Sequence, residues 1–303
     1  MQIGIPRALY YFDYYPLWET FFTELGFDVC VSPPTNKEIL HWGLSTCVDG
    51  ACLSLKSYVG HCQALARQGV DLLFIPQIIS VFKREYTCPN FLGLPDLVHQ
   101  YLPETVQLES PVIDRRKGEL ALSGYFQTGQ KFATYPRVIR ACQKALRAQR
   151  SFALSQEKQL NYSSSKKVTI LLLGPRYLTD DSFLNGNLRE HLENLGVQVF
   201  SPWHLADSTT FRASSTLKKR PFWTGVRRSV GALLYLLDRL DGVVSVAPFG
   251  CGAESMLGHL IDREVRGKGV AHLELIVDEH TSEVGLITRL EAFYDLLERK
   301  KSG

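Results

Sequence analysis

The sequence has little net charge, no long apolar run and no signal-type segment at its start. The formal net charge is only +3 over 303 residues, and the basic residues are scattered, so nucleic acid is not an expected partner. The apolar stretch at 233–246 is interrupted by Asp238, Arg239 and Asp241, whereas a membrane span needs roughly 20 apolar residues. Because Met1 leads directly into I-G-I-P, without a basic segment and an apolar core, we expect a cytoplasmic protein that does not associate with a membrane.

The seven cysteines include no local C-x-x-C pair. An odd number in a chain without an export signal favours free thiols, metal ligands or a reactive thiol over a disulfide framework. Cys30 alternates within a predicted strand, Cys142 falls on the apolar face of a predicted helix, and Cys62 lies inside another helix. A lone cysteine is most often a small buried apolar residue, so we interpret these three as core thiols.

Cys52, Cys88 and Cys251 lie instead in predicted turns that contain Gly or Pro. Thiolates can converge from such turns, so these three residues are the candidate ligands of one metal centre. Thiolate-rich sites suit zinc or an iron–sulfur cluster, and the spacing does not separate the two. Cys47 lies five residues before Cys52, close enough to approach the same centre, and its role stays open.

Short apolar runs bounded by Gly or Pro alternate with helical patterns in both halves of the chain. The expected strands are 2–5, 27–31, 70–76, 105–112, 168–174, 197–201, 242–247 and 271–277. The expected helices are 16–25, 35–42, 56–67, 94–102, 136–149, 187–195, 220–238, 255–266 and 286–300. This alternation predicts an α/β protein with two Rossmann-like, doubly wound parallel-sheet domains that face each other across a cleft.

The predicted domains are 1–154, which carries Cys52 and Cys88, and 168–303, which carries Cys251. Between them, the polar stretch 155–167 contains S-S-S-K-K and is typical of a linker. The second half repeats the first in outline, as two similar α/β units would.

Two stretches resemble nucleotide-binding motifs. Residues 50–57 match the phosphate loop G-x-x-x-x-G-K-S except that Leu55 replaces the second glycine, and we reject this interpretation. The stretch G-C-G-A-E-S at 250–255 is a partial G-x-G-x-x-G that follows a predicted strand and opens a helix. With Asp278 at the end of the next strand, it supports a rival hypothesis of a dinucleotide site.

Three further residues are candidates for binding a cofactor or substrate. Glu279 and His280, in D-E-H-T at 278–281, follow a predicted strand at the edge of the sheet where ligands gather. The alternative is that Thr281 or Ser282 simply caps the next helix. Lys56 lies in the first turn of the helix after Cys52, where it either supports the cysteine site or is packed or solvated.

Several longer motifs resemble one family. They are I-G-I-P-R-A-L-Y-Y-F, C-L-S-L-K-S-Y-V-G-H, I-P-Q-I-I-S, Y-T-C-P-N-F-L-G-L-P-D, P-F-G-C-G-A-E-S and D-E-H-T-S-E-V-G-L-I-T-R-L-E-A-F. They resemble the acyl-CoA dehydratase activase-related proteins, relatives of the iron–sulfur subunits of 2-hydroxyacyl-CoA dehydratases and of the double-cubane cluster proteins. The resemblance spans nearly the whole chain.

The resemblance implies a [4Fe-4S] cluster, in preference to a double-cubane cluster, held by Cys52, Cys88 and Cys251 with one iron left to a small ligand or substrate. The helices at 56–67 and 255–266 would aim their positive ends at such an anionic cluster. The implied function is low-potential electron transfer or reductive chemistry, as a reductase component or a dehydratase-like lyase. Electrons would come from a separate ATP-driven activator or another donor.

The implied partners also include an acyl-CoA or other small substrate and a second subunit, in a homo- or hetero-dimer. The alternative function is a non-redox protein that binds a nucleotide or acyl-CoA in the cleft between the domains.

Overall fold

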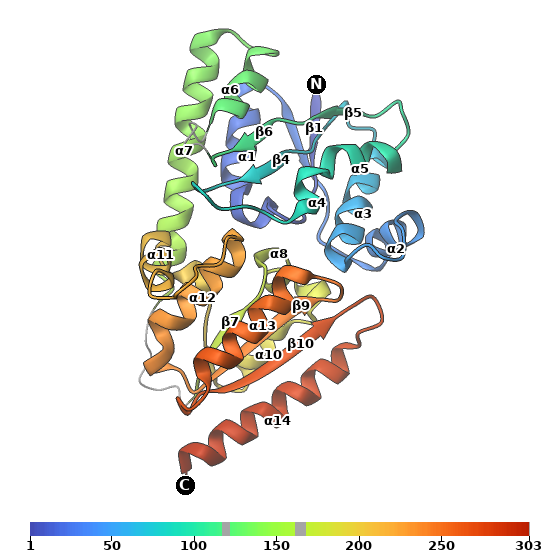
Figure 1. The fold of residues 1–303 in the computed structure, drawn as a ribbon. Coiled ribbons are helices and arrows are strands. Elements are labelled where there is room, and N and C mark those ends of the chain that lie inside the picture. Colours follow the sequence, from blue (N-terminus) through green and yellow to red (C-terminus); the bar gives the residue numbers. More distant parts are fainter. Residues whose placement is uncertain (117–121, 161–167, 303) are drawn as a thin grey trace. The chain divides into compact units, whose positions relative to one another are not determined.

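In the computed structural model, which describes residues 1–116, 122–160 and 168–302, each half of the chain forms an α/β unit around a parallel sheet (Figure 1). Unit 1 consists of Met1–Phe152 and Phe222–Thr224. Unit 2 consists of Ala153–Pro221 and Gly225–Gly303. The predicted fold class, α/β with parallel sheets, is confirmed.

The sheet of unit 1 has four parallel strands in the order β2-β1-β3-β5. The strands are β1 (Gln2–Ile5), β2 (Asp28–Val31), β3 (Leu72–Phe74) and β5 (Gln107–Glu109). A separate parallel pair joins β4 (Gln77–Ser80) to β6 (Val112–Asp114). All three residues of β3 are buried, as expected of an inner strand of a parallel sheet that is covered on both faces.

Aromatic residues of α1 (Tyr11–Leu25) fill the core of unit 1. The ring of Phe74 lies 5.1 Å from Trp18 and 4.9 Å from Phe22 between centroids, and Trp18 Nε1 donates to the Tyr125 hydroxyl at 2.8 Å. The other helices are α2 (Lys37–Thr46), α3 (Leu53–Arg67), α4 (Pro89–Leu92), α5 (Leu94–Tyr101), α6 (Ser123–Gln130) and α7 (Tyr135–Glu157).

The sheet of unit 2 also has four parallel strands, in the order β10-β9-β7-β8. The strands are β7 (Thr169–Leu173), β8 (Gln198–Phe200), β9 (Gly242–Pro248) and β10 (Ala271–Val277). The helices are α8 (Arg176–Thr179), α9 (Ser182–Asn185), α10 (Leu188–Asn194), α11 (Asp207–Ser214), α12 (Thr224–Leu236), α13 (Gly252–Val265) and α14 (Glu283–Ser302). Two 3-10 turns, η1 (Pro202–His204) and η2 (Leu237–Arg239), follow β8 and α12.

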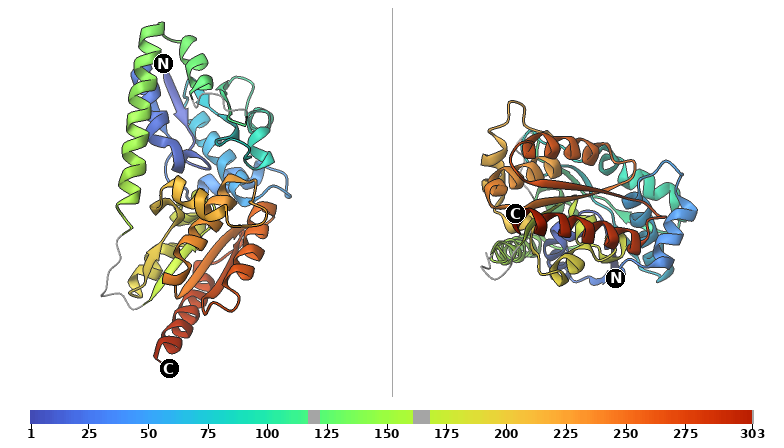
Figure 2. Two further views of the ribbon diagram at one scale, coloured as in Figure 1. Left: turned by 60° about the vertical axis from the view of Figure 1, so that its left-hand side comes forward. Right: turned by 90° about the horizontal axis from the view of Figure 1, so that it is seen from below.

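The two sheets have the same strand order relative to the chain. In each sheet the first strand pairs with the second strand on one side and with the third strand on the other. The order in which strands are added to the sheet therefore reverses between β1 and β3 in unit 1, and between β7 and β9 in unit 2. Helices accordingly cover both faces, and α13 and α14 lie on opposite sides of β10 (Figure 2). In doubly wound sheets, ligands bind at the carboxyl ends of the strands near this reversal.

Several predicted boundaries differ from the structure. The helix expected at 136–149 is α7, which continues to Glu157 and so includes the first residues of the predicted linker 155–167. Residues 161–167 of that linker lie outside the described residues. The sequence did not predict the strand pair β4–β6 or the helices α6 and α11. Such short elements depend on tertiary contacts rather than on a long periodic pattern. Within the described ranges, no helix has the length and hydropathy to cross a membrane.

Candidate functional site

The three cysteines singled out in the sequence share one structural position. Cys52 is the N-cap residue of α3, Cys88 that of α4 and Cys251 that of α13. Each is partly exposed, and no side chain of the three makes the usual capping hydrogen bond to its own helix. The first backbone N–H groups of these helices therefore have no side-chain cap from these cysteines.

Within its own unit, each of these cysteines lies toward the carboxyl edge of the sheet. Cys251 follows β9 directly, beside the reversal between β7 and β9. Cys88 is close to Tyr10, which follows β1; burial chiefly raises the pKa of Tyr10, and Cys88 adds to the increase. The ring of Phe91 on α4 lies 4.8 Å from that of Tyr10. Cys52 begins the helix that returns the chain to the amino end of β3.

The remaining cysteines have different surroundings. Cys62 and Cys142 are buried, and burial raises the pKa of Cys142 to about 11, so the interpretation of these two as core thiols is confirmed. For Cys30 that interpretation is wrong. Its side chain is partly exposed, and its thiol donates to the amide oxygen of Gln68 at 3.3 Å, because β2 is an edge strand whose outer side is not covered.

Cys47 and Lys56 lie close together where α2 ends and α3 begins. Burial raises the pKa of the Cys47 thiol to about 11. The charge of Lys56 lowers this pKa in part, and Cys52 raises it further. Lys56 is only 5% exposed, so it is packed and not solvated. The Lys56 cation and the thiols of Cys47 and Cys52 therefore share this corner of unit 1.

No group of three or more His, Cys, Asp or Glu side chains in the described part of the chain has the geometry of a metal site. Cys52 and Cys88 belong to unit 1 and Cys251 to unit 2, and the structure describes each unit by itself. The convergence of the three thiols thus stays a prediction from the sequence.

The D-E-H-T stretch forms a hydrogen-bonded turn after β10. Asp278 Oδ1 accepts from the backbone N–H of His280 at 3.0 Å and from the Thr281 hydroxyl at 2.8 Å. These bonds, the Thr281 bond first, lower the pKa of Asp278. Ser282 Oγ accepts from Gly285 N at 3.2 Å, so the capping alternative is confirmed for Ser282. A ligand-binding role for Glu279 and His280 stays a prediction.

Glu254 is a titratable residue that the sequence analysis missed. It lies in the first turn of α13, three residues after Cys251, and is 7% exposed. Burial raises the pKa of its carboxyl to about 8, so this group holds a proton at neutral pH. Strongly shifted carboxyls often mark functional sites, and the signal in the sequence was its place in G-C-G-A-E-S. The rival dinucleotide hypothesis rests on the same motif and on Asp278, whose Oδ1 accepts two hydrogen bonds within the turn, and it stays a prediction.

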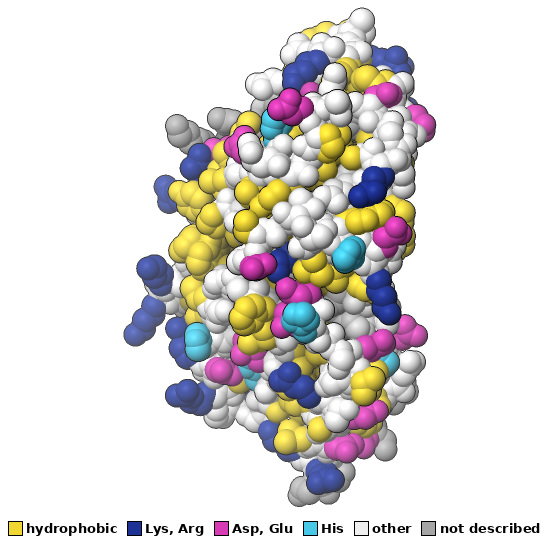
Figure 3. All heavy atoms as spheres, turned by 90° about the vertical axis from the view of Figure 1, so that its right-hand side faces the viewer, with side chains coloured by type: hydrophobic (Ala, Val, Ile, Leu, Met, Phe, Trp, Pro, Cys, Tyr) yellow, Lys and Arg dark blue, Asp and Glu magenta, His cyan; other side chains and the backbone are white. Residues whose placement is uncertain are grey.

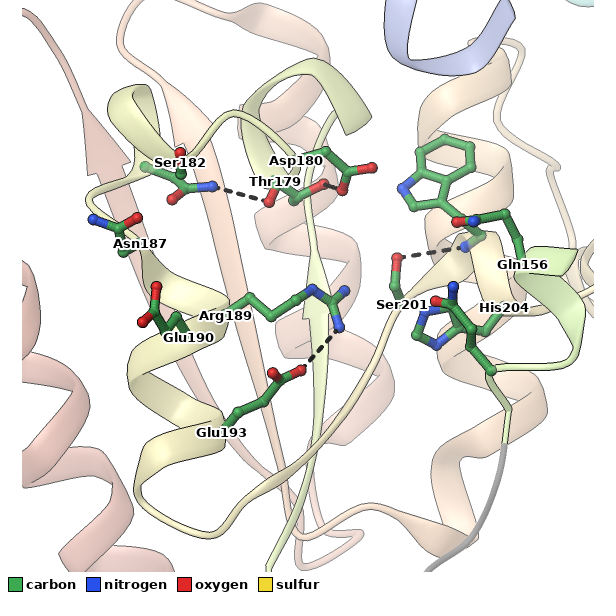
Figure 4. A pocket seen from close by; sticks show the side chains of 13 residues that line it. Gln156, Thr179, Asp180, Ser182, Asn187, Arg189, Glu190, Glu193, Ser201 and His204 are labelled. Atoms are coloured by element: carbon green, nitrogen blue, oxygen red, sulfur yellow. Dashed lines mark hydrogen bonds and ion pairs between the residues drawn. The ribbon is translucent and has the colours of Figure 1, made fainter. Parts of the chain in front are cut away.

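A cavity of about 430 Å³ lies within unit 2, beyond the carboxyl ends of β7 and β8. Its walls come from the end of α7, the segment after β7, helix α10 and the turn η1 after β8. Almost all lining side chains are polar, and Figure 4 shows Arg189 extending from α10 toward the side that Ser201 and His204 form. The sequence analysis did not predict this cavity, because its residues come from four separate segments of the chain.

Ser245, His272 and Asp262 form a hydrogen-bonded chain in unit 2. Ser245 Oγ lies 2.7 Å from His272 Nε2, and His272 Nδ1 lies 2.6 Å from Asp262 Oδ1. This is the order of a nucleophile, a base and an orienting acid. Ser245 nevertheless lies within β9 and is 4% exposed, so no substrate carbonyl can reach its hydroxyl. We interpret this set of hydrogen bonds between serine, histidine and aspartate as structural.

On the face that Figure 3 shows, basic and acidic side chains are interspersed with apolar ones. This distribution matches the small net charge of the sequence.

The fold and the three N-cap cysteines together define a doubly wound α/β protein with candidate thiolate ligands. The model of the family described as "CoA enzyme activase uncharacterised domain" matches residues 2–205 of the 303. The match covers more than half of the chain, which therefore belongs to this family, and the predicted resemblance is confirmed. No curated protein matches the chain.

Solved structures with a similar course of the chain include the SBP FpvC from P. aeruginosa in complex with Ni²⁺, at 11% identity and a TM-score of 0.28, covering 100% of this chain and 98% of that one. Another is ZnuA, at 10% identity and a TM-score of 0.29, covering 97% and 96%. At these values the likeness carries no argument.

Proposed function

We propose that this protein is an iron–sulfur protein in which the thiolates of Cys52, Cys88 and Cys251 hold a [4Fe-4S] cluster. One observation carries the proposal: these three are N-cap residues with partly exposed side chains, whereas Cys47, Cys62 and Cys142 are buried. A ligand sulfur must be reachable and able to lose its proton, and burial opposes both.

The helices behind two of these cysteines suit an anionic group. α3 and α13 contain 15 and 14 residues, and their N-terminal N–H groups have no side-chain cap from Cys52 or Cys251. A negative charge at such an end is stabilised by the aligned peptide dipoles and by hydrogen bonds from the backbone. Lys56, in the first turn of α3, adds a cation beside the first of these cysteines.

The proposed role is low-potential electron transfer or reductive chemistry, with electrons supplied by a separate ATP-driven activator or another donor. A bound cluster would supply a one-electron carrier. The residues of this chain would hold it, compensate its charge through Lys56 and the helix ends, and leave one iron to a small substrate such as an acyl-CoA. Membership of a CoA enzyme activase family supports a partner enzyme.

The test is iron and acid-labile sulfide per chain after anaerobic purification and reconstitution. We expect the wild type to be brown and to contain both elements, and we expect Cys52→Ala, Cys88→Ala and Cys251→Ala each to lose most of the iron. Cys62→Ala and Cys142→Ala are matched controls that should keep it, because they lose only packing. Equal iron in the Cys88→Ala and Cys142→Ala variants contradicts the ligand assignment. A colourless, iron-free wild type supports the non-redox alternative, a protein that binds a nucleotide or acyl-CoA.

Cys47→Ala decides whether the cluster has an open position. Because the buried Cys47 thiol has a raised pKa of about 11, we expect this variant to keep its iron. Iron loss would instead mean a site with four thiolates, closed to substrate and suited to an electron carrier.

A further inference from the structure

The cavity of unit 2 has a rigid frame at the carboxyl ends of two adjacent strands. Asn185 Nδ2 donates to the carbonyl oxygens of Leu178 and Thr179 at 2.8 and 2.9 Å, and Asn185 Oδ1 accepts from Leu188 N at 3.2 Å. This amide therefore ties the segment after β7 to the start of α10. On the other wall, Ser201 caps η1 directly after β8. The volume of about 430 Å³ lies within the range of small-molecule sites.

The charged side chains around the cavity are largely compensated by one another. Arg176 Nε donates to Asp180 Oδ2 at 2.9 Å, and its Nη2 donates to Gln156 Oε1 at 3.0 Å. Arg189 Nη1 lies 3.6 Å from Glu193 Oε1. Since carboxylates outnumber the single lining guanidinium, a phosphate or another multiply charged anion would be repelled. The frame suits a ligand without large net charge.

Two polar groups in this wall have no hydrogen-bond partner among the described residues. They are His204 Nδ1 and Trp203 Nε1, both buried atoms. His204 is only 6% exposed, and burial first, then the charge of Arg189, lowers its pKa to about 4, so the imidazole is neutral. A buried polar atom left without a partner is costly, and such atoms lining a cavity indicate a polar ligand.

The chemistry of the lining narrows the class of ligand. The cavity offers obligate donors in Arg189 and Trp203, obligate acceptors in Asp180 and Glu190, and amides that do both. A hydroxyl group is uncharged and both donates and accepts, so neighbouring hydroxyls can satisfy such a mixed wall.

Vicinal hydroxyls occur in free sugars and in the ribose of nucleosides. The surroundings of Trp203 favour a free sugar over a nucleoside as the ligand. The guanidinium of Arg228 lies 4.4 Å from the indole centroid and that of Arg176 lies 5.2 Å from it. These cations occupy the surroundings on which a purine or pyrimidine would stack. We propose that this cavity is a binding site for a small, uncharged polyhydroxylated molecule of the sugar or sugar-alcohol class. The proposal does not depend on the cysteine site.

The test is isothermal titration calorimetry of the full chain with D-glucose, D-galactose, D-ribose and D-mannitol, alongside adenosine and glycine. We expect at least one sugar or sugar alcohol to bind at a single site per chain. Arg189→Ala and Trp203→Phe should each weaken that binding by about tenfold or more, because each removes a donor. Arg263→Ala is the matched control, since Arg263 pairs with Glu264 on α13, outside the cavity.

Absence of sugar binding up to about 10 mM overturns the proposal. So does binding of adenosine or glycine without any sugar, and so does sugar binding that neither Arg189→Ala nor Trp203→Phe weakens. Circular dichroism of each variant confirms that it is folded. Iron content measured on the same samples should not change, which separates a failure here from a failure of the cluster assignment.

Discussion

Gly43 of α2 and Gly60 of α3 face each other, and a Cβ added at either glycine would lie 3.2 Å from the backbone nitrogen of the other. The Gly43 methyl would also overlap the carbonyl oxygen of Lys56, and the Gly60 methyl that of Ile39. The two helices therefore approach backbone to backbone, and this contact fixes the helix that begins at Cys52.

We expect Gly43→Ala and Gly60→Ala each to lower the free energy of unfolding by about 1 to 3 kcal/mol, because the methyl group forces the helices apart. Urea denaturation measures the change. Gly50→Ala is the control, since an added Cβ there meets nothing within 4 Å. Wild-type stability in both interface variants would show that the helices are not packed this closely.

His61 makes the stability of unit 1 depend on pH. It is 0% exposed, its ring nitrogens lie 2.9 Å from the Ser32 hydroxyl and 3.0 Å from the Thr35 hydroxyl, and burial, with Arg7, lowers its pKa from 6.5 to about 3. The unfolded chain therefore binds the proton more tightly. The stabilisation by neutral His61 is complete above pH 6.5 and is lost as pH falls toward 3.

We expect the free energy of unfolding to fall by about 1.4 kcal/mol per pH unit through this window on account of His61. His61→Gln should flatten the decline, as measured by urea denaturation between about pH 7 and pH 5. His99→Gln, at an exposed position of α5, is the control and should decline as the wild type does. Identical slopes for His61→Gln and wild type would refute the assignment.

Glu254 has the opposite effect in unit 2. Its carboxyl pKa is raised from 4.5 to about 8 by burial, so the folded chain binds the proton more tightly. This stabilisation is complete below pH 4.5 and is lost as pH rises through 8. Glu254→Gln cannot ionise, so its stability relative to wild type should rise by about 1.4 kcal/mol per pH unit in that window. Glu291→Gln, exposed on α14, should show no such trend in urea denaturation.

The Ser245–His272–Asp262 chain should contribute stability and no hydrolysis. His272→Ala leaves the buried Ser245 hydroxyl without its partner and should cost about 1 to 3 kcal/mol in unfolding free energy. The double variant with Ser245→Ala should recover part of that loss, because no buried hydroxyl remains. His259→Ala, exposed on α13, is the control. Ester hydrolysis by wild type that Ser245→Ala abolishes would show that the serine is catalytic.

The sequence predicted the elements whose pattern is long and local. The strand expected at 271–277 is β10 at Ala271–Val277, and the helix expected at 56–67 is α3, which starts three residues earlier at Leu53. Turn residues likewise placed Cys52, Cys88 and Cys251 in turns, because Gly and Pro punctuate the chain irrespective of distant partners. In the structure each of the three is the N-cap residue of a helix. Family membership followed from contiguous motifs.

Only the tertiary structure decided which distant residues meet. The cavity of unit 2 joins Gln156 of α7 to His204 of η1, the hydroxyl of Ser245 on β9 meets His272 on β10, and Gly43 meets Gly60 across two helices. Burial, which shifts the pKa values of His61 and Glu254, is also a property of packing. Periodicity and turn chemistry act over a few residues, whereas desolvation and side-chain contacts depend on elements that the chain brings together only when it folds.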